Sequence, residues 1–216
     1  KGKKKDMLKY SKQLAKITPQ IVKESKELLN AMGIQCVQAP GEGEAQAAHM
    51  AKTKRVYAVG SQDYDSLLFG SPRLIQNLTL SRKRKTSGGY KSINPKLIEL
   101  ERVLNSLQID EEQLISLGIL VGTDYNPKGV EGIGQKTARK IVNSREYPVK
   151  IFQAVEEKMN NMPEEHQFDW TEIFSLFKNP EVKNVEVNIP KMDTDKVKQL
   201  LLDKDFSEKR IDSGLE

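Results

Sequence analysis

The stretch RVYAVGSQDYDSLLFG, residues 55–70, is the part of the sequence that indicates the fold most directly. Its first six residues form a compact apolar run, which is typical of a strand buried in a parallel sheet. Two aspartates, Asp63 and Asp65, follow this run at once. Ligands of open α/β sheets bind just beyond the carboxyl ends of the strands, so these carboxylates stand where a functional site is expected.

The residues on either side extend this strand into an α/β layer. A second short strand is predicted over residues 34–40, and the Ala-rich end of the segment that follows it, residues 41–52, is predicted to be helical. A third strand is predicted over residues 73–80, then a basic surface loop over 81–92 and a helix over 95–107. This alternation of strands and helices predicts a parallel sheet flanked by helices.

Both ends of the chain are predicted to be helical. A charged helix is expected over residues 6–15, and Thr18-Pro19 begins another helix, with Thr18 as its N-cap, that runs to about Met32. Acidic residues cap a helix over Asp110–Val121, and no convincing strand follows it. Four aromatic residues are expected to form the core of the C-terminal part: Phe168, Trp170, Phe174 and Phe177.

The composition excludes several classes of protein. The 216-residue chain is 37% hydrophobic and 30% charged, which is typical of a globular protein and not of a fibrous or disordered one. No apolar run approaches the roughly 18 residues that a membrane span needs, and no secretory signal opens the chain. The single cysteine, Cys36, cannot form an internal disulfide, which indicates a reducing, intracellular setting.

The net charge of +5 is concentrated near the N-terminus. Residues 1–30 hold nine lysines against three acidic residues, so this segment carries +6 and the rest of the chain sums to −1. Such a basic arm can line a path for single-stranded nucleic acid, or it can simply be a solvated charged helix. The candidate contacts for a nucleic-acid strand are Lys3, Lys4, Lys5 and Lys12.

Carboxylates gather at the predicted ends of elements, and five of them are candidate catalytic and metal-binding residues: Glu42, Glu44, Asp63, Asp65 and Asp124. Oxygen ligands without an accompanying His or Cys cluster suit Mg²⁺ or Mn²⁺ better than zinc. Two such ions about 3.5–4 Å apart can activate a water and stabilise the leaving oxygen of a phosphodiester. The alternative is that these residues are ordinary helix caps and solvated loop residues.

The segment GVEGIGQKTA, residues 129–138, lies between two helical patterns and resembles a helix–hairpin–helix module. A helix that starts at about Gln135 points free N–H groups at an anion, so the module holds a DNA backbone without recognising bases. The alternative is a plain glycine-rich turn. The candidate DNA contacts are Gly132, Gly134, Gln135, Lys136 and Arg139.

Three motifs in order resemble the flap endonuclease family, in its archaeal version. They are MGIQCVQAPGEGEAQAAHMA (32–51), YAVGSQDYDSLLFG (57–70) and ILVGTDYNPKGVEGIGQKTA (119–138). The final residues, FSEKRIDSGLE (206–216), are similar to the last core helix of that family.

The resemblance implies a PIN-like 5′-nuclease core with a helix–hairpin–helix module and a helical C-terminal portion. It divides the chain into the trailing part of a helical arch with the helix that follows (1–32), the nuclease core (33–108), the hairpin module (109–150) and helices that complete the core (151–216).

By the same resemblance, the function is structure-specific cleavage of 5′ DNA flaps, with 5′–3′ exonuclease activity, in Okazaki fragment maturation and repair. Glu42 and Glu44 serve the first of two Mg²⁺ positions, Asp63 and Asp65 serve the second, and Asp124 completes the cluster. Mn²⁺ can substitute for Mg²⁺, and hairpin carbonyls commonly bind K⁺. The implied partners are branched DNA and a sliding clamp, and the implied protein is a monomer, cytoplasmic in an archaeon or nuclear in a eukaryote.

The chain departs from the family pattern in what it contains. The N-terminal part, with two further metal-binding aspartates, is absent, and so is the C-terminal clamp-binding tail. Gly41 also stands where the family often has a small hydroxyl residue. A non-catalytic DNA-binding fragment, a related 5′ exonuclease and a junction resolvase therefore remain as alternatives.

Overall fold

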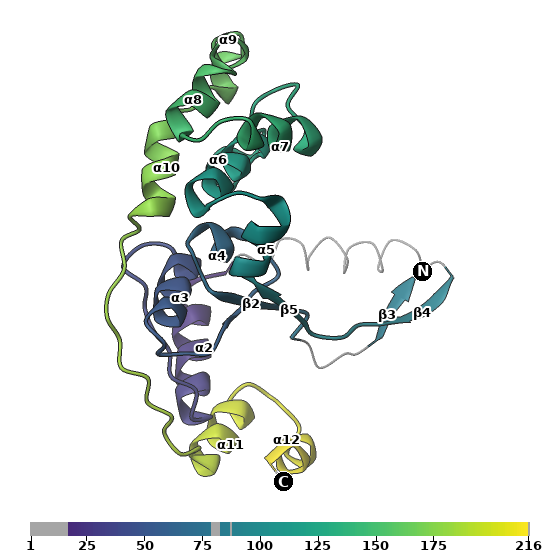
Figure 1. Cartoon of the computed structure of the whole chain (residues 1–216). Helices are drawn as coiled ribbons and strands as arrows, with labels where there is room; N and C mark the ends of the chain where they lie inside the picture. The colour runs from purple at the N-terminus through teal and green to yellow at the C-terminus, as the bar shows by residue number, and fades with distance from the viewer. Residues whose placement is uncertain (1–16, 79–82, 87, 216) are drawn as a thin grey trace. The chain divides into compact units, whose positions relative to one another are not determined.

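The computed structural model describes residues 17–78, 83–86 and 88–215 (Figure 1). The chain divides into two compact units, residues 38–186 and residues 1–37 together with 187–216. The larger unit contains the five candidate carboxylates and the glycine-rich hairpin. The charged helix expected over residues 6–15, and the basic contacts Lys3, Lys4, Lys5 and Lys12, lie outside the described residues.

The larger unit is built on a small mixed sheet. Strand β1 (Val59–Gly60) runs parallel to β2 (Arg73–Gln76), and β2 pairs antiparallel with β5 (Lys96–Glu99). Leu74 of β2 lies opposite Ile98 of β5, and both are buried in the core. The α/β class is as predicted, although β5 runs antiparallel.

All three predicted strands are shorter than expected or absent, and the one predicted over residues 73–80 is a strand at Arg73–Gln76 but not at 77–78. The apolar run over residues 55–60 forms a strand only at β1, and residues 34–40 have no regular structure. The N–H groups of Arg55 and Val56 both bond to the carbonyl of Met50, so the chain is still leaving the preceding helix at this point. Side-chain patterning favours a strand, but a strand also requires a neighbour for its backbone groups.

Two predictions between residues 81 and 107 are wrong. The basic stretch is not an open loop but contains a hairpin of β3 (Lys83–Thr86) and β4 (Gly89–Ser92), which Figure 1 shows extending beyond β5. The helix predicted over 95–107 begins as β5, and only α5 (Leu100–Leu107) is helical. In β5 the exposed Leu97 precedes the buried Ile98, which is the alternation of a strand.

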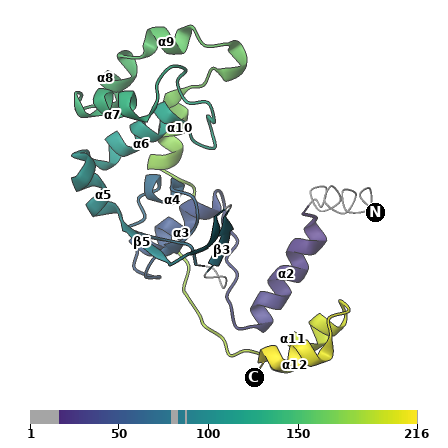
Figure 2. The ribbon, with the colours of Figure 1, turned by 90° about the vertical axis from the view of Figure 1, so that its right-hand side faces the viewer.

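Helices cover this sheet and continue past one end of it (Figures 1 and 2). The capping of α6 is as predicted: the Asp110 carboxylate accepts from the Gln113 N–H at 2.8 Å, and the Gln113 side chain accepts from the Asp110 N–H. The predicted aromatic cluster is confirmed, because Trp170 packs edge-on against Phe174 with their ring centroids 6.4 Å apart, and Phe168, Trp170 and Phe174 pack against the core that contains Phe177. The remaining elements are α3 (Gly43–Lys52), α4 (Asp65–Leu68), α6 (Glu111–Val121), α7 (Gln135–Asn143), α8 (Pro148–Gln153), α9 (Glu156–Asn160), the 3₁₀ turn η1 (Glu164–His166) and α10 (Trp170–Lys178).

The smaller unit is helical in its described part. It contains α2 (Pro19–Ala31), α11 (Thr194–Leu202) and α12 (Glu208–Leu215), and α11 packs against both of the others. The predicted cap of α2 is confirmed, because the Thr18 hydroxyl accepts from the Ile21 N–H at 3.3 Å and Pro19 occupies the first turn. None of the described helices is long and apolar enough to cross a membrane.

Candidate active site and nucleic-acid interface

The first two carboxylates lie at the start of α3. Glu42 is the N-cap residue of this helix, and Glu44 is in its first turn. Helix α3 packs into the core through Ala45 and Ala48, which are 1% and 0% exposed. The helix dipole favours negative charge at this end, so the fold supports both carboxylates here.

Glu44 is tied to the loop that follows β1. The Ser61 hydroxyl donates a short hydrogen bond to Glu44 Oε1, and the same hydroxyl accepts from the Asp63 N–H at 3.1 Å. Glu44 Oε2, in contrast, is buried and has no hydrogen-bond partner. A buried carboxylate oxygen left in this state is costly unless a donor or a cation approaches it.

The negative charges of the other four candidate carboxylates act on Asp65. It is the first residue of α4, and burial raises its pKa from 3.8 to about 6, helped by the negative charges of the other four candidates. Each of those charges disfavours ionisation of Asp65. The three segments that sequence analysis selected therefore lie near enough for their charges to act on Asp65.

The raised pKa of Asp65 predicts that the stability of the protein depends on pH. Because folding raises the pKa of Asp65, its favourable contribution is complete below pH 3.8 and is lost as the pH rises through about 6. We expect Asp65→Asn to raise the free energy of unfolding by about 1 kcal/mol at pH 7 without divalent metal, a value reduced for solvent screening. Urea unfolding in EDTA at pH 4 and pH 7 measures this difference. A variant that is no more stable than the wild type at pH 7 contradicts the prediction.

A turn after α6 holds Asp124. The buried side chain of Asn126 donates to the carbonyl of Ile119 at 2.8 Å and accepts from the Thr123 hydroxyl at 2.7 Å and from the Thr123 N–H at 3.1 Å. Gly122, with φ +120°, ends the helix in a conformation that other residues rarely adopt. Asp124 is itself exposed, so the buried neighbours fix its backbone while its carboxylate stays free to bind.

Tyr125 joins this turn to α3. Its hydroxyl donates to Glu42 Oε2 at 3.1 Å, and its ring packs edge-on against Phe177. Burial, together with the hydrogen bond to Glu42, raises the pKa of Tyr125 to about 12. The phenol therefore stays protonated and orients Glu42 as a donor.

The chemistry of the cluster fits divalent cations that prefer oxygen ligands. The donors are all carboxylates, one buried oxygen of Glu44 lacks a partner, and burial together with its neighbours' negative charge raises the pKa of Asp65. Within the described ranges, no three carboxylate, His or Cys side chains are close enough to bind one ion together. The side chains must therefore approach one another to share an ion.

The glycine-rich hairpin is packed against the end of α6. A Cβ on Gly129, which has φ +59°, would lie 2.5 Å from the backbone of Val121, and the Val130 N–H bonds to the Leu120 carbonyl at 2.9 Å. Gly132 also has a positive φ, +74°. These contacts join the hairpin to the same helix end that carries Asp124.

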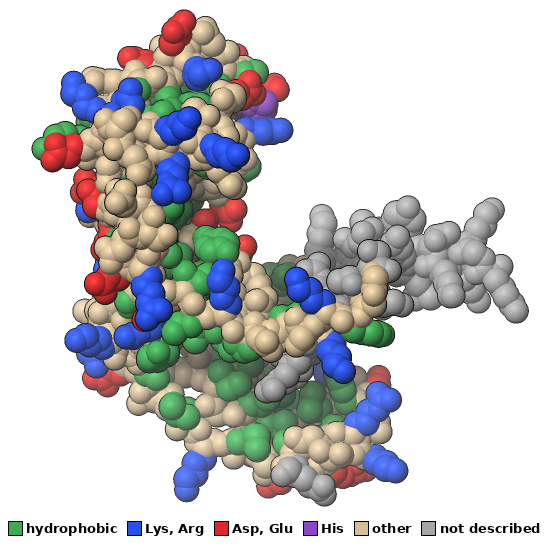
Figure 3. Space-filling model, turned by 45° about the vertical axis from the view of Figure 1, so that its right-hand side comes forward, with side chains coloured by type: hydrophobic (Ala, Val, Ile, Leu, Met, Phe, Trp, Pro, Cys, Tyr) green, Lys and Arg blue, Asp and Glu red, His purple; other side chains and the backbone are tan. Residues whose placement is uncertain are grey.

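Helix α7 begins after this hairpin with free backbone donors. Gly134 is its N-cap and provides no side chain to satisfy them, and a Cβ on this residue would meet nothing within 4 Å. Gln135, Lys136 and Arg139 are exposed on the first turns. On the face drawn in Figure 3, Lys and Arg side chains are spread over the helical part that contains α7. This helix start is suited to bind phosphate oxygens.

One cavity of about 640 Å³ is lined by three of the five predicted carboxylates and by the start of α7, whereas Glu42 and Glu44 do not line it. The carboxylates on its wall are Asp63, Asp65 and Asp124, and the residues of α7 on its wall are Gln135, Lys136 and Arg139. Its apolar floor includes leucines of α4, α5 and α6. The predicted DNA contacts Gly132 and Gly134 do not line the cavity.

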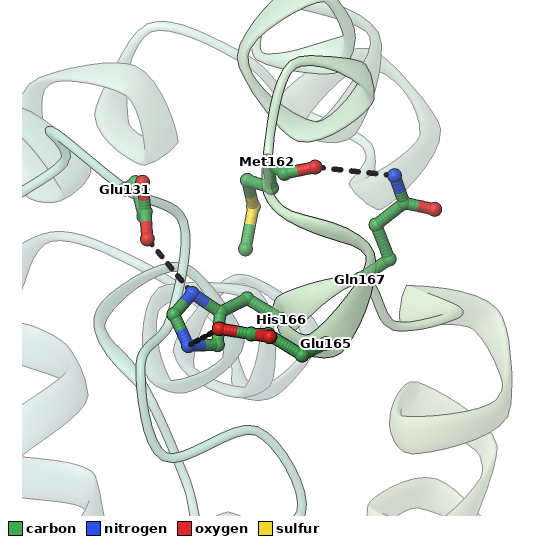
Figure 4. A network of polar contacts seen from close by, with 5 residues as sticks. All are labelled: Glu131, Met162, Glu165, His166 and Gln167. Atoms are coloured by element: carbon green, nitrogen blue, oxygen red, sulfur yellow. Dashed lines mark hydrogen bonds and ion pairs between the residues drawn. The ribbon is translucent and has the colours of Figure 1, made fainter.

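A polar network holds the hairpin from its other side (Figure 4). His166 Nδ1 lies 2.9 Å from Glu131 Oε1, and Gln167 donates to the Met162 carbonyl at 3.2 Å. Glu131 is the acidic residue inside the hairpin, and this contact joins its side chain to the 3₁₀ turn η1.

Sequence reasoning missed the residues that orient the carboxylates. Ser61 and Tyr125 adjoin the acidic motifs, so their hydroxyls were the available signal. Asn126, two residues after Asp124, was a candidate for a turn-stabilising amide. The partners of Glu131 and Glu42 lie 35 and 83 residues away in the chain, and no local pattern predicts them.

Comparison with known proteins places this geometry in a family. The XPG I-region family matches residues 33–124. The chain is 47% identical over 213 residues to flap endonuclease 1 of Aeropyrum pernix, an alignment that covers 96% of this chain and 59% of the relative. This chain belongs to the flap endonuclease family. It spans about 60% of the length of the curated family members it matches.

Solved structures agree with this family assignment. The flap endonuclease-1 from Methanococcus jannaschii is similar with a TM-score of 0.75 and 38% identity, covering 98% of this chain and 61% of the other. The catalytic core of Rad2 in complex with a DNA substrate shares the fold, with a TM-score of 0.71 and 20% identity, over 98% of this chain and 71% of that one.

Proposed function

We propose that this protein is a structure-specific 5′ nuclease that hydrolyses DNA phosphodiesters at 5′ flaps. The observation that carries the proposal is the single cavity with the Asp63, Asp65 and Asp124 carboxylates on one wall and the basic start of α7 on another. Duplex DNA bound by its phosphates at α7 would lie beside the acidic cluster. The names of the archaeal relatives, flap endonuclease 1, support the choice of substrate.

The five carboxylates would hold two Mg²⁺ ions, with Mn²⁺ as a substitute. When bound, the ions supply activation of a water and stabilisation of the leaving oxygen. The chain's own residues orient the ligands: Ser61 fixes Glu44, and the protonated phenol of Tyr125 fixes Glu42. Neither histidine lines the cavity that holds Asp63, Asp65 and Asp124: His49 bonds to Asn184 through Nε2, and His166 bonds to Glu131 through Nδ1.

The hairpin and α7 would bind the duplex without regard to sequence. Backbone N–H groups, Lys136 and Arg139 meet phosphates, which every DNA sequence presents. A K⁺ ion held by hairpin carbonyls would add positive charge at the same place. With the duplex bound by its phosphates, the geometry of the junction, and not its base sequence, would select the substrate.

An assay for Mg²⁺-dependent cleavage tests the proposal. A 5′-flap substrate is compared with a nicked duplex, a single strand and a four-way junction, each in Mg²⁺ and in EDTA. Both this chain and a form extended with the unmatched residues of an archaeal relative are assayed. We expect cleavage at the flap base in Mg²⁺ only, and a preference for the four-way junction would favour a resolvase.

A non-catalytic DNA-binding role is the second candidate. The observation that favours it is that no three described carboxylates are yet close enough to share an ion. Flap binding without cleavage in either form, at any Mg²⁺ concentration, would support this role and contradict the nuclease.

The basic start of α7 predicts a salt-dependent effect. Lys136→Ala should weaken duplex binding about fivefold and reduce the slope of log affinity against log salt by about 1, because one phosphate contact is lost. Fluorescence anisotropy over roughly 50–200 mM salt measures both the affinity and the salt slope. Arg102→Ala, which also removes one exposed cation from this unit, is the matched control. Equal effects of both substitutions would mean that only net charge matters.

A further inference from the structure

The segment of residues 181–184, after α10, contacts the chain on both sides of the Glu42–Glu44 pair. It has no regular secondary structure. Before the pair, a Cβ on Gly41 would lie 3.3 Å from the Glu181 carbonyl oxygen. After the pair, Gln46 of α3 bonds to the same segment.

The side-chain amide of Gln46 bonds to both backbone groups of Lys183, as a neighbouring strand would. Gln46 Nε2 donates to the Lys183 carbonyl at 2.8 Å, and the Lys183 N–H donates to Gln46 Oε1 at 3.0 Å. Gln46 is 3% exposed, so its end of both bonds is buried. A third contact joins His49 Nε2 to Asn184 Oδ1 at 2.9 Å, one turn further along α3.

This contact reaches the first turn of α3 through the backbone. The Gln46 N–H donates to the Glu42 carbonyl at 3.1 Å, which is the first hydrogen bond of the helix. Fixing the side chain of Gln46 therefore fixes the N-cap residue Glu42, and Glu44 lies between them. A helix end is otherwise the part of a helix that frays most easily.

We propose that Gln46 is a positioning residue for the metal-binding carboxylates. By anchoring the first turn of α3 to the 181–184 segment, it holds Glu42 and Glu44 against the repulsion of the acidic cluster. The inference rests on the proposed function, because it assumes that these carboxylates bind divalent ions. It adds a part of the chain 137 residues away to the machinery of the site.

The hydrogen bonds of Gln46 oppose the repulsion between the carboxylates. Glu44 has one buried oxygen without a partner, and Glu42 and Glu44 both lie at the start of α3. Without a cation, these groups gain by moving apart. A first turn free to do so would have to be ordered again on binding, and this cost would reduce metal affinity.

The test uses metal-induced stabilisation, which needs no cleavage. The thermal midpoint of the chain is followed as Mg²⁺ is added, for the wild type and for Gln46→Met, which keeps the volume and removes both hydrogen bonds. We expect the half-saturating Mg²⁺ concentration to rise about tenfold in the variant, as is typical when a group that orients a ligand is lost. Duplex affinity in EDTA should stay within about twofold of the wild type, because α7 is untouched.

Gln113→Met is the matched control. The Gln113 amide also joins a helix to backbone carbonyls, those of Val142 and Arg145, but at the start of α6. It should lower the midpoint without changing the half-saturating Mg²⁺ concentration. If Gln46→Met does not fold, Lys183→Pro removes one of the two bonds while leaving α3 intact, and about a threefold rise is expected.

The outcomes separate the two proposals. A variant at Gln46 or Lys183 that loses stability but keeps the wild-type Mg²⁺ response overturns the positioning role and leaves the nuclease untouched. A wild-type chain whose midpoint does not respond to Mg²⁺ contradicts the metal site itself, and the positioning role with it.

Discussion

Asp124→Asn should reduce flap cleavage roughly 10³-fold or more while the protein still folds and binds the flap. The substitution removes one negative charge at nearly constant shape. The turn that presents Asp124 is held by Asn126 and Thr123, whose hydrogen bonds do not involve the Asp124 side chain. Single-turnover cleavage in Mg²⁺ and flap binding in EDTA measure the two parts of the prediction.

The control for this loss is a carboxylate of the same unit outside the cluster. Glu101→Gln changes the same charge on α5, and the cleavage rate should stay within about twofold of the wild type. If Asp124→Asn weakened flap binding as much as cleavage, Asp124 would be a binding residue and its catalytic assignment would be wrong.

Gly129→Ala should destabilise the fold by about 3 kcal/mol or more. Its φ of +59° is unfavourable for any residue with a Cβ, and that Cβ would lie 2.5 Å from the carbonyl carbon and oxygen of Val121. The neighbour is backbone at the end of α6, so it cannot move aside as a flexible side chain would. Urea unfolding of the chain measures the effect.

Gly134→Ala provides the matched substitution in the same hairpin. Gly134 has a φ of −84°, and a Cβ there would meet nothing within 4 Å. We expect its free energy of unfolding to change by less than about 0.5 kcal/mol. Equal losses in both variants would mean that the close approach at Gly129 does not determine the stability of the hairpin.

Features with a local cause could be predicted from the sequence. Thr18 and Asp110 cap helices because their side chains satisfy N–H groups three residues ahead, which a short window reveals. The five carboxylates were recognisable because they follow predicted elements. The raised pKa of Asp65, to which the charges of the other four contribute, supports their lying near one another.

Features that depend on a distant partner could not be predicted. The run at residues 55–60 has the composition of a strand, but its first N–H groups still bond to the preceding helix. The four residues of β5 are too few to distinguish a strand period from a helix period. The anchoring of Gln46 joins segments that have no pattern in common, since a buried amide can pair with any backbone.

The close approach of Gly129 to α6 has a consequence for where a nuclease of this kind can cut. Residues 119–130 are cross-bonded from end to end: Asn126 to Ile119, Gly129 to Asn126 and Val130 to Leu120. Asp124 and the glycine-rich hairpin thus belong to one stiff piece of backbone. The number of nucleotides between the bound duplex and the scissile bond would then be a fixed length of protein, the same on every DNA sequence.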